Sequence, residues 1–595
     1  MAKNIKTQIQ KTLILILLVA ITIVPVQAQT KEERVIINSQ DWTDVYSGVL
    51  YANLKGYPNY FLTSPRSATL LPYQIPKTVN KITIITSRDK PFASGYKALL
   101  EIEGYKEVEE IRQANLNIEL AKMLPEINKF IVIDDSYGYN SISVAPYAAL
   151  GKYYVLFADR GNIGQVENFL QSRTVNEIII YGQVDRQVKT RLEQFNPIII
   201  NTGDRFDDNI EIVKRYQTLH KQLKGEERRQ AILNNGEFIE SSLMSGSDPV
   251  LFIGFSNVPE QVRNYISTSN LEVGTLVGNE LIGTATFIRR QTGLSVFVKF
   301  GQGSRTPQNT IAQVEDLDRF PIPRYGLNLA VVAATLNTAT NNLEITYQNR
   351  APIGTHFRAI SFLLIDGTTT HTIQDDETIN FVDANDYKTI LYQVKDVDGN
   401  DIQLESQQLS AQITTIYGES PKSLEQTLIT NVSIQRISIL DEADIEIVDA
   451  SYQKSGSKFL VKIKNIGAVD AYVAIEIPDV YVNGEYLIFT SSEPVMIKPG
   501  KTKTIPVSTT MENEDIIENP EVKIRALFGE RETALTKQKQ ATFAFKFAAM
   551  DFTIYIIPLL LLILLFLILF KKKCKNCGTK NPIGKKHCKK CGHRL

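Results

Sequence analysis

The sequence predicts a multidomain protein: α/β repeats built on parallel sheets, then two β-sandwich domains, one transmembrane helix and a small four-cysteine module. Three observations predict this order. Two stretches near the amino end repeat each other at an offset of 96 residues. The next region is rich in short β-branched runs with no helical pattern between them. An uncharged run of 19 residues, 552–570, then precedes a tail that carries all four cysteines.

The first 28 residues have the layout of a secretory signal. Lys3, Lys6 and Lys11 precede the apolar run 13–26, and Ala28 is the small residue before the expected cut. The alternative is an uncleaved anchor, although the 14 residues of this run are short for a bilayer span. Either interpretation exports the body of the chain.

Residues 35–124 and 127–217 form two copies of one unit, and a partial third copy is predicted at 225–305. The matching segments are 51–57 with 147–153, 78–85 with 174–181, and 117–122 with 209–214. In the second copy, we expect strands at 129–133, 153–158, 177–181 and 197–201, and helices at 143–150, 163–172 and 184–195. Short apolar strands that alternate with helices predict a parallel sheet covered on both faces.

Four segments of the second copy match family motifs. They are IVIDDSYG at 131–138, VAPYAAL at 144–150, IIIYG at 178–182 and GDRF at 203–206. These segments resemble the type 2 cell-wall-binding repeat of bacterial and archaeal surface proteins. The resemblance implies an α/β fold in which a trio of repeats binds an anionic wall polymer. The first and third copies lack the closing motif.

Two strand-rich regions follow. Runs at 328–335, 342–347, 356–365, 378–382 and 388–394 predict a β-sandwich over 325–416. The polar stretch 417–441 contains Pro421 and is predicted as a linker. A second sandwich is predicted at 442–547, where 458–467, 471–477 and 497–507 resemble adhesion-type immunoglobulin-like modules of prokaryotic surface proteins. That resemblance implies a fold but no particular ligand.

The uncharged run 552–570 predicts one transmembrane helix. Its 19 residues would span roughly 28 Å as a helix, about the thickness of the hydrocarbon core. Lys571, Lys572 and Lys573 follow directly, and lysine-rich flanks stay in the cytoplasm. We therefore expect a single-pass cell-membrane protein with its body outside and its tail, 571–595, inside.

Charge and cysteine usage describe the exported part. It holds 52 basic and 65 acidic residues, an excess that argues against binding nucleic acid through bulk electrostatics. It holds no cysteine, so its domains need cores that are stable without disulfides. This pattern favours a prokaryotic envelope protein over a disulfide-rich secreted eukaryotic protein.

The tail carries the most specific motif of the chain. Cys574 and Cys577 form one pair, and Cys588 and Cys591 form a second pair with the same spacing. Two such pairs predict one structural zinc ion in a closed four-sulfur site, the alternatives being unliganded thiols or iron. The motif resembles the short zinc ribbons at the ends of many prokaryotic membrane proteins. Its lysines suggest contact with anionic lipid, a cytoplasmic partner or RNA, or they are simply solvated.

Two further candidate sites lie in the exported part. Asp134 and Asp135 follow a predicted parallel strand at the sheet edge where ligands usually bind, although two turn-forming aspartates would look the same. Asn431 begins a glycosylation sequon. Common hydrolase, metalloprotease, phosphate-loop and dinucleotide motifs are absent, so we do not expect an enzyme.

Together these patterns predict a structural or adhesive surface protein that presents a wall-polymer-binding-like head on a β-sandwich stalk. Its expected partners are the membrane and a cell-wall polymer, surface-layer polymer or glycan. A transmembrane sensor that signals through the zinc ribbon is one alternative. An envelope hydrolase built on the repeats is another.

Overall fold

The computed structural model describes residues 33–278, 281–301, 303–305, 314–316, 318–324, 326–373, 377–548, 571–582 and 584–595. The predicted signal and the predicted transmembrane run lie outside these ranges. Within them, no helix is both long enough and apolar enough for a membrane span. The chain divides into two compact units, Met1–Asp441 with Asn483–Glu485, and Glu442–Val482 with Tyr486–Leu595.

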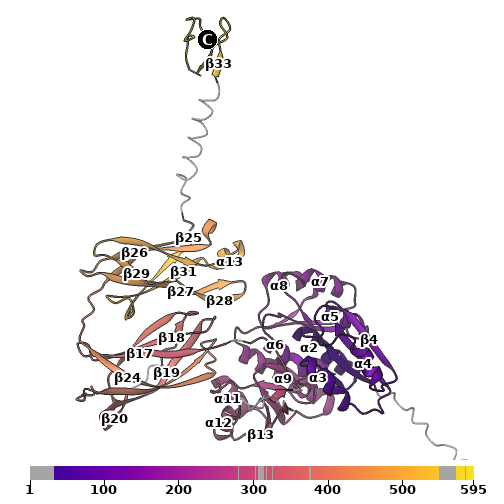
Figure 1. The fold of residues 1–595 in the computed structure, drawn as a ribbon. Coiled ribbons are helices and arrows are strands. Elements are labelled where there is room, and N and C mark those ends of the chain that lie inside the picture. Colours follow the sequence, from indigo (N-terminus) through magenta and orange to yellow (C-terminus); the bar gives the residue numbers. More distant parts are fainter. Residues whose placement is uncertain are drawn as a thin grey trace, which may run out of the picture. The chain divides into compact units, whose positions relative to one another are not determined.

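The first unit begins with an α/β region (Figure 1), whose strands form three four-stranded parallel sheets of one topology. Each sheet has its second strand at one edge, then its first, third and fourth strands in that order. The strands are β1 (Glu33–Asn38), β2 (Asn59–Phe61), β3 (Lys81–Ser87) and β4 (Val108–Gln113); β5 (Lys129–Ile133), β6 (Tyr154–Phe157), β7 (Glu177–Tyr181) and β8 (Ile198–Ile200); and β9 (Gln230–Asn234), β11 (Val250–Phe252), β12 (Val273–Val277) and β13 (Ser295–Lys299). The third copy, which we predicted as partial, therefore has a complete sheet.

Helices connect these strands as the apolar patterns predicted. The helices are α2 (Trp42–Lys55), α3 (Pro65–Leu70), α4 (Tyr96–Ile102), α5 (Leu116–Lys122), α6 (Tyr139–Gly151), α7 (Ile163–Gln171), α8 (Arg186–Leu192), α9 (Arg205–Lys224), α10 (Ser241–Met244), α11 (Glu260–Thr268) and α12 (Ile282–Thr292). The first helices of the three copies, α2, α6 and α10, contact one another. One continuous apolar core runs through all three copies.

A buried asparagine joins each of the first two copies to the next. Asn117 of α5 donates to the Val155 carbonyl (2.9 Å) and accepts from the Phe157 amide (3.2 Å), both on β6 of the second copy. Asn209 of α9 bonds β11 of the third copy in the same way, through Val250 (3.0 Å) and Phe252 (2.8 Å). Each asparagine therefore fixes the edge strand of the following sheet. This explains why the two segments repeat in the sequence.

The first β-sandwich completes this unit. Its strands are β17 (Leu329–Asn337), β18 (Asn342–Asn349), β19 (Thr355–Asp366), β20 (Thr369–Ile373), β21 (Asn380–Val382), β22 (Tyr387–Gln393), β23 (Leu409–Gly418) and β24 (Gln426–Ile437). These strands form one path, β20-β19-β23-β24-β17-β18-β22, with β21 paired to β19. Its two halves, here called its two sheets, are in contact through rings of Tyr347 and Phe357 (4.4 Å) and of Phe362 and Tyr392 (4.3 Å).

The predicted linker, 417–441, is wrong in this structure. It contains β24, which pairs with β23 along its length and with β17 at its end, and so joins the two sheets. The segment looked like a linker because only Ile434 of the strand is buried, while Asn431, Ser433 and Gln435 are exposed. On the face of β24 that packs on the core, Leu428 and Val432 are only partly buried, and Thr430 lies between them, so the apolar alternation in the sequence is weak.

The second unit contains another pair of sheets, β25-β26-β30 and β28-β27-β31-β32, with β29 paired to β27. Its elements are β25 (Ile445–Gln453), β26 (Lys458–Asn465), β27 (Ala471–Val482), β28 (Glu485–Thr490), β29 (Val495–Ile497), β30 (Thr502–Ser508), α13 (Asn513–Glu518), β31 (Glu521–Gly529) and β32 (Lys537–Ala544). The α/β region followed by strand-rich regions is thus confirmed. The immunoglobulin-like assignment stays a prediction.

The two sandwiches share local details. Asn349 and Asn465 are both fully buried, and each side chain bonds the backbone of the following loop. Each sandwich also has a turn after a strand-ending glycine, closed by a bridge between Ser420 and Ser423 in the first and between Arg531 and Ala534 in the second. The second turn therefore serves as an internal comparison for the first.

Candidate functional site

The four cysteines of the tail form a compact cluster. Their sulfur atoms all lie within 4.8 Å of one another. The Sγ atoms of Cys574 and Cys591 are 3.6 Å apart, and those of Cys577 and Cys588 are 3.4 Å apart. A tetrahedral site with Zn–S bonds of about 2.3 Å has sulfur–sulfur edges of about 3.8 Å. The cluster is therefore compatible with one metal ion held by four sulfurs.

Two matching turns bring the sulfurs together. The amide of Gly578 donates to the Cys574 carbonyl (2.9 Å), and the amide of Gly592 donates to the Cys588 carbonyl (3.0 Å). Both glycines have φ near +70°, which a residue with a side chain rarely adopts. A glycine directly after the second cysteine of each pair therefore allows the turn to close. Across the turns, β33 (Lys571–Lys573) pairs with β34 (Lys580–Pro582).

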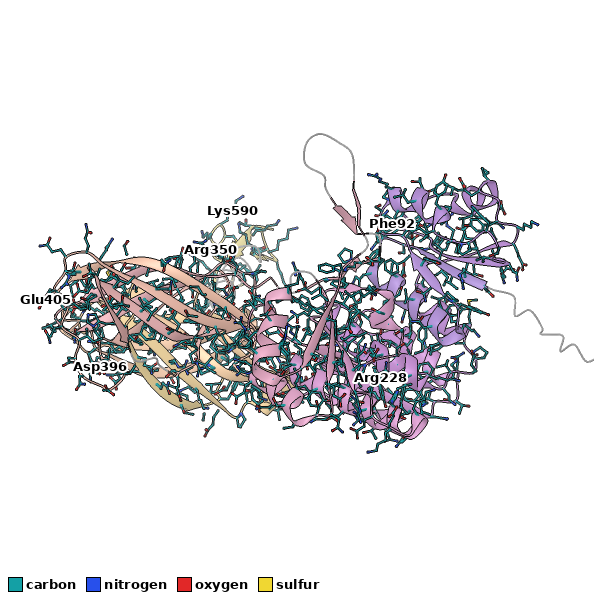
Figure 2. All side chains as sticks on the ribbon, turned by 90° about the horizontal axis from the view of Figure 1, so that it is seen from below. Phe92, Arg228, Arg350, Asp396, Glu405 and Lys590 are labelled. Carbon is teal, nitrogen blue, oxygen red and sulfur yellow. The ribbon has the colours of Figure 1, made fainter. Side chains whose placement is uncertain are left out.

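Polar groups around the Cys588 sulfur favour its thiolate form. The Lys590 amide points at the Cys588 sulfur (3.4 Å) and lowers the pKa of that thiol to about 6. The buried Asn581 side chain also donates to this sulfur (3.5 Å) and accepts from the Lys589 amide (2.9 Å). The lysines of the tail, including Lys590 in Figure 2, are exposed.

A metal ion held by all four sulfurs has no open coordination position, so the metal would be structural.

The predicted ligand site at Asp134 and Asp135 lies directly after β5. Asp134 accepts from the Ser136 amide (2.7 Å), which is the bond of a turn-forming aspartate. Burial raises the pKa of Asp135, and the nearby Asp134 and Asp159 carboxylates add to this effect. No other group of three or more close metal-ligating side chains occurs among the described residues. Asn431 lies exposed on β24.

A second cluster, which the sequence did not reveal, lies where the first sandwich meets the third sheet. The β23–β24 loop (419–425) reaches the carboxyl ends of β9 and β11. There the Glu425 carbonyl accepts three successive backbone amides, from Phe255 (3.1 Å), Ser256 (3.2 Å) and Asn257 (3.0 Å). This is the edge of a parallel sheet at which ligands usually bind. In the third copy, the chain itself occupies that edge.

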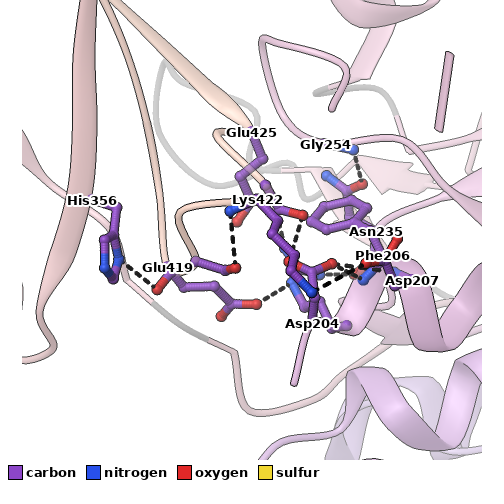
Figure 3. A network of polar contacts seen from close by, with 12 residues as sticks. Asp204, Phe206, Asp207, Asn235, Gly254, His356, Glu419, Lys422 and Glu425 are labelled. Carbon is purple, nitrogen blue, oxygen red and sulfur yellow. Dashed lines mark hydrogen bonds and ion pairs between the residues drawn. The ribbon is translucent and has the colours of Figure 1, made fainter. Parts of the chain in front are cut away.

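Arg205 is at the centre of this junction, and Figure 3 labels its two partners, Glu419 and Glu425. Its side chain is 7% exposed, its Nε lies 2.8 Å from Glu419 Oε1, and its Nη2 bonds a carboxylate oxygen of Glu425. The guanidinium also lies over the Phe206 ring, 4.5 Å from the centroid. Burial alone would lower the pKa of Arg205, but the two glutamates outweigh burial and raise it.

Neighbouring groups complete the junction. Asp204 caps α9 by accepting from the amides of Phe206 (2.9 Å) and Asp207 (3.1 Å), and its other oxygen accepts from the Ser423 hydroxyl (2.6 Å). His356 Nδ1 lies 3.1 Å from the Glu419 carbonyl. Burial raises the pKa of Glu419 to about 8 despite the nearby arginine, and burial lowers the pKa of His356 to about 4.

Sequence analysis named two residues of this junction as part of a motif and did not predict a site there. Asp204 and Arg205 belong to the closing motif of the second copy, where the fold places them at the start of α9. Their partners were missed, because Glu425 is 220 residues away from Arg205 and lies in the segment predicted as a linker. The second sandwich has Ala534 and Thr536 in the places of Ser423 and Glu425, so a comparison of the two turns would have been the available signal.

Comparisons with known proteins give limited findings. No family model matches the chain, and no curated protein does. Among solved structures, Cwp8 from Clostridium difficile is 14% identical over 44% of this chain and 48% of its own, with a TM-score of 0.35. Cwp6 from Clostridium difficile has the same identity and TM-score over 44% of each chain. The chain thus spans less than half the length of these two proteins.

Proposed function

We propose that this chain is a single-pass envelope protein with a structural or adhesive role. The α/β head and two β-sandwich domains are exported, the run 552–570 spans the membrane, and the four-cysteine module folds around zinc in the cytoplasm. The observation that carries this proposal is the partition of cysteine. All four thiols lie beyond the apolar run, and there their sulfurs form one closed cluster. A reducing compartment keeps such thiols available for metal.

The head supports a binding role rather than a catalytic one. At the carboxyl ends of the strands, other parts of the chain occupy the positions where a substrate would bind. The β23–β24 loop covers this edge of the third sheet, and Asp134 closes a turn at this edge of the second sheet. The motifs of the second copy resemble repeats that bind an anionic wall polymer as trios, and the head contains three sheets of one topology. We therefore propose a surface polymer or glycan as the ligand of the head.

The natural absence of other cysteines makes the topology directly testable. A membrane-impermeant maleimide should not label the protein on intact cells, and should label it after lysis with a zinc chelator present. Ser492→Cys, in an exposed bend between β28 and β29 of the second sandwich, is the matched variant and should be labelled on intact cells. Labelling of the unsubstituted protein on intact cells would reverse the orientation and remove the proposed role.

Binding should be measured with the full chain in nanodiscs. A head fragment that ends before the first sandwich would lack Glu419 and Glu425 and leave Arg205 without its partners. We expect retention on purified wall or surface-layer material at moderate ionic strength. The Cys574→Ser/Cys577→Ser variant should bind equally well, because the module lies on the other side of the membrane. If no envelope polymer retains the protein, the adhesive role is wrong.

A further inference from the structure

One end of the second sandwich, here called the base face, gathers three segments that are separate in the sequence (Figure 1). They are the turn between β25 and β26, the start of α13, and the chain that leaves β32. The Thr509 amide bonds the Ser457 carbonyl (2.9 Å), and Lys454 bonds Asn513 at the start of α13. The Tyr452 amide bonds the Lys546 carbonyl (2.8 Å). The chain therefore exits from this face.

Large apolar side chains are exposed on the base face. Phe547 is 56% exposed and Ile517 of α13 is 78% exposed. Phe547 is not on a loose end, because the following amide, of Ala548, bonds the Tyr452 carbonyl (2.8 Å). Its ring packs on Phe545 (5.8 Å), and Phe545 in turn packs on Phe459 of the core (5.8 Å). The rings of Phe459, Phe545 and Phe547 thus form a continuous series of contacts from the core to the surface.

Chain length limits how far this face can be from a bilayer. Four peptide steps separate Ala548 from the start of the apolar run at Phe552, and four steps reach at most about 14 Å. The polar headgroup layer is itself about 5 to 8 Å thick on each side of the hydrocarbon core. The base face must therefore lie within about 6 to 9 Å of the outer surface of the headgroup layer, if 552–570 spans the membrane as proposed.

We infer that the base face docks on the outer surface of a phospholipid bilayer, with Phe547 and Ile517 at the boundary between headgroups and acyl chains. Aromatic and aliphatic side chains are typical of proteins at this boundary. Lys454, which bonds Asn513, and Lys546, which pairs with Asp449, are also exposed there, so both ammonium groups remain accessible to lipid phosphates. The second sandwich would then contact the membrane directly, and its orientation relative to the bilayer would be restricted. This inference rests on the proposed span.

Tryptophan quenching tests the inference in the full chain. The protein has one native tryptophan, Trp42 in the head, so a variant adds one emission to a constant background. The Phe547→Trp variant is reconstituted in phosphatidylcholine nanodiscs. One acyl chain of each lipid is brominated close to its ester bond. Ile466→Trp is the matched control, because Ile466 is 48% exposed and follows the far end of β26.

We expect about a twofold loss of the emission added at position 547, since a ring at the headgroup boundary lies within a few ångströms of the bromines. The emission added at position 466 should not change. Equal quenching at both positions, or none at 547, would overturn the inference, including the case in which a second copy of the chain covers Phe547. Resistance of the protein to carbonate extraction reports separately on the span, so failure of the proposed function would be recognised.

Discussion

Arg205 holds its charge where its side chain is only 7% exposed. Removing such a cation from water costs several kcal/mol, and the attraction of well-placed anions must offset this. Glu425 supplies a carboxylate, Glu419 supplies a second carboxyl group whose pKa is raised to about 8, and the aromatic ring of Phe206 covers one face of the guanidinium. The arrangement is balanced only while Arg205 and both of these glutamates are present. The junction should therefore respond strongly to the loss of one of them.

Arg205→Met should destabilise the first unit by about 3 to 5 kcal/mol, because it leaves the buried carboxyl groups of Glu419 and Glu425 without a cation. Urea unfolding followed by the fluorescence of Trp42, the single tryptophan, would measure the change. Arg160→Met is the matched control, since Arg160 pairs with Asp185 at 3.0 Å but is 49% exposed. We expect less than about 1 kcal/mol there. Equal effects of the two variants would contradict the role given to burial.

The stability of the same unit should depend on pH through Glu419. Its pKa is raised from 4.5 to about 8, chiefly by burial, so the folded state keeps a proton that the unfolded state releases. The contribution is complete below pH 4.5 and is lost as pH rises toward 8. Glu419→Gln should remove this loss in urea midpoints measured by Trp42. Glu530→Gln, at the corresponding turn of the second sandwich, should leave the slope unchanged.

At the scale of elements, the buried asparagines hold neighbouring repeats together. Asn117→Ala removes two bonds to β6 and one to Ser47 (2.9 Å). At about 1 kcal/mol for each bond, we expect a loss of roughly 2 to 4 kcal/mol in the Trp42 transition. Asn270→Ala removes an exposed bond to Glu227 and should cost almost nothing. If Asn117→Ala unfolds at the wild-type urea concentration, the repeats are held by apolar packing alone.

The four-cysteine module should require metal to fold. A segment of 25 residues has too small a core, so the free energy of metal binding supplies the stability. Purified full-length protein should contain one zinc ion per chain by elemental analysis, and Cys588→Ser should lose it. Lys589→Ser, next to the ligand, should keep it. Iron in place of zinc, or retention of zinc by every single cysteine variant, would contradict this assignment.

Individual elements show what the sequence could and could not predict. Strands such as β5 and β7 were predicted at their observed bounds because a buried parallel strand is a continuous apolar run. The cysteine cluster was predictable because its four ligands lie within one short segment. In contrast, β24 was missed because it joins two sheets and buries little of either face. Asp134 illustrates a remaining ambiguity, since turn-forming and ligand-binding aspartates share one sequence pattern.

At the scale of the whole molecule, the domains can be predicted from the sequence, but the contacts by which one domain stabilises another cannot. The repeat pattern marks a head, and the strand pattern marks a sandwich, yet the polar contacts that join them link positions such as Asp204 and Ser423, far apart in the chain. Each of these residues has an ordinary local role, as a helix cap and as part of a turn. No local pattern separates that role from a contact with a distant segment.

The joined head and first sandwich should therefore behave as one folding unit. A fragment of residues 29–441 should unfold, by Trp42 fluorescence, at a higher urea concentration than a fragment of residues 29–324. The shorter fragment loses Glu419, Glu425 and the β23–β24 loop, and exposes Arg205 with the amides of 255–257. Arg205→Met should harm the longer fragment by about 3 to 5 kcal/mol and leave the shorter one nearly unchanged. Equal unfolding of the two fragments would show that the head is stable by itself.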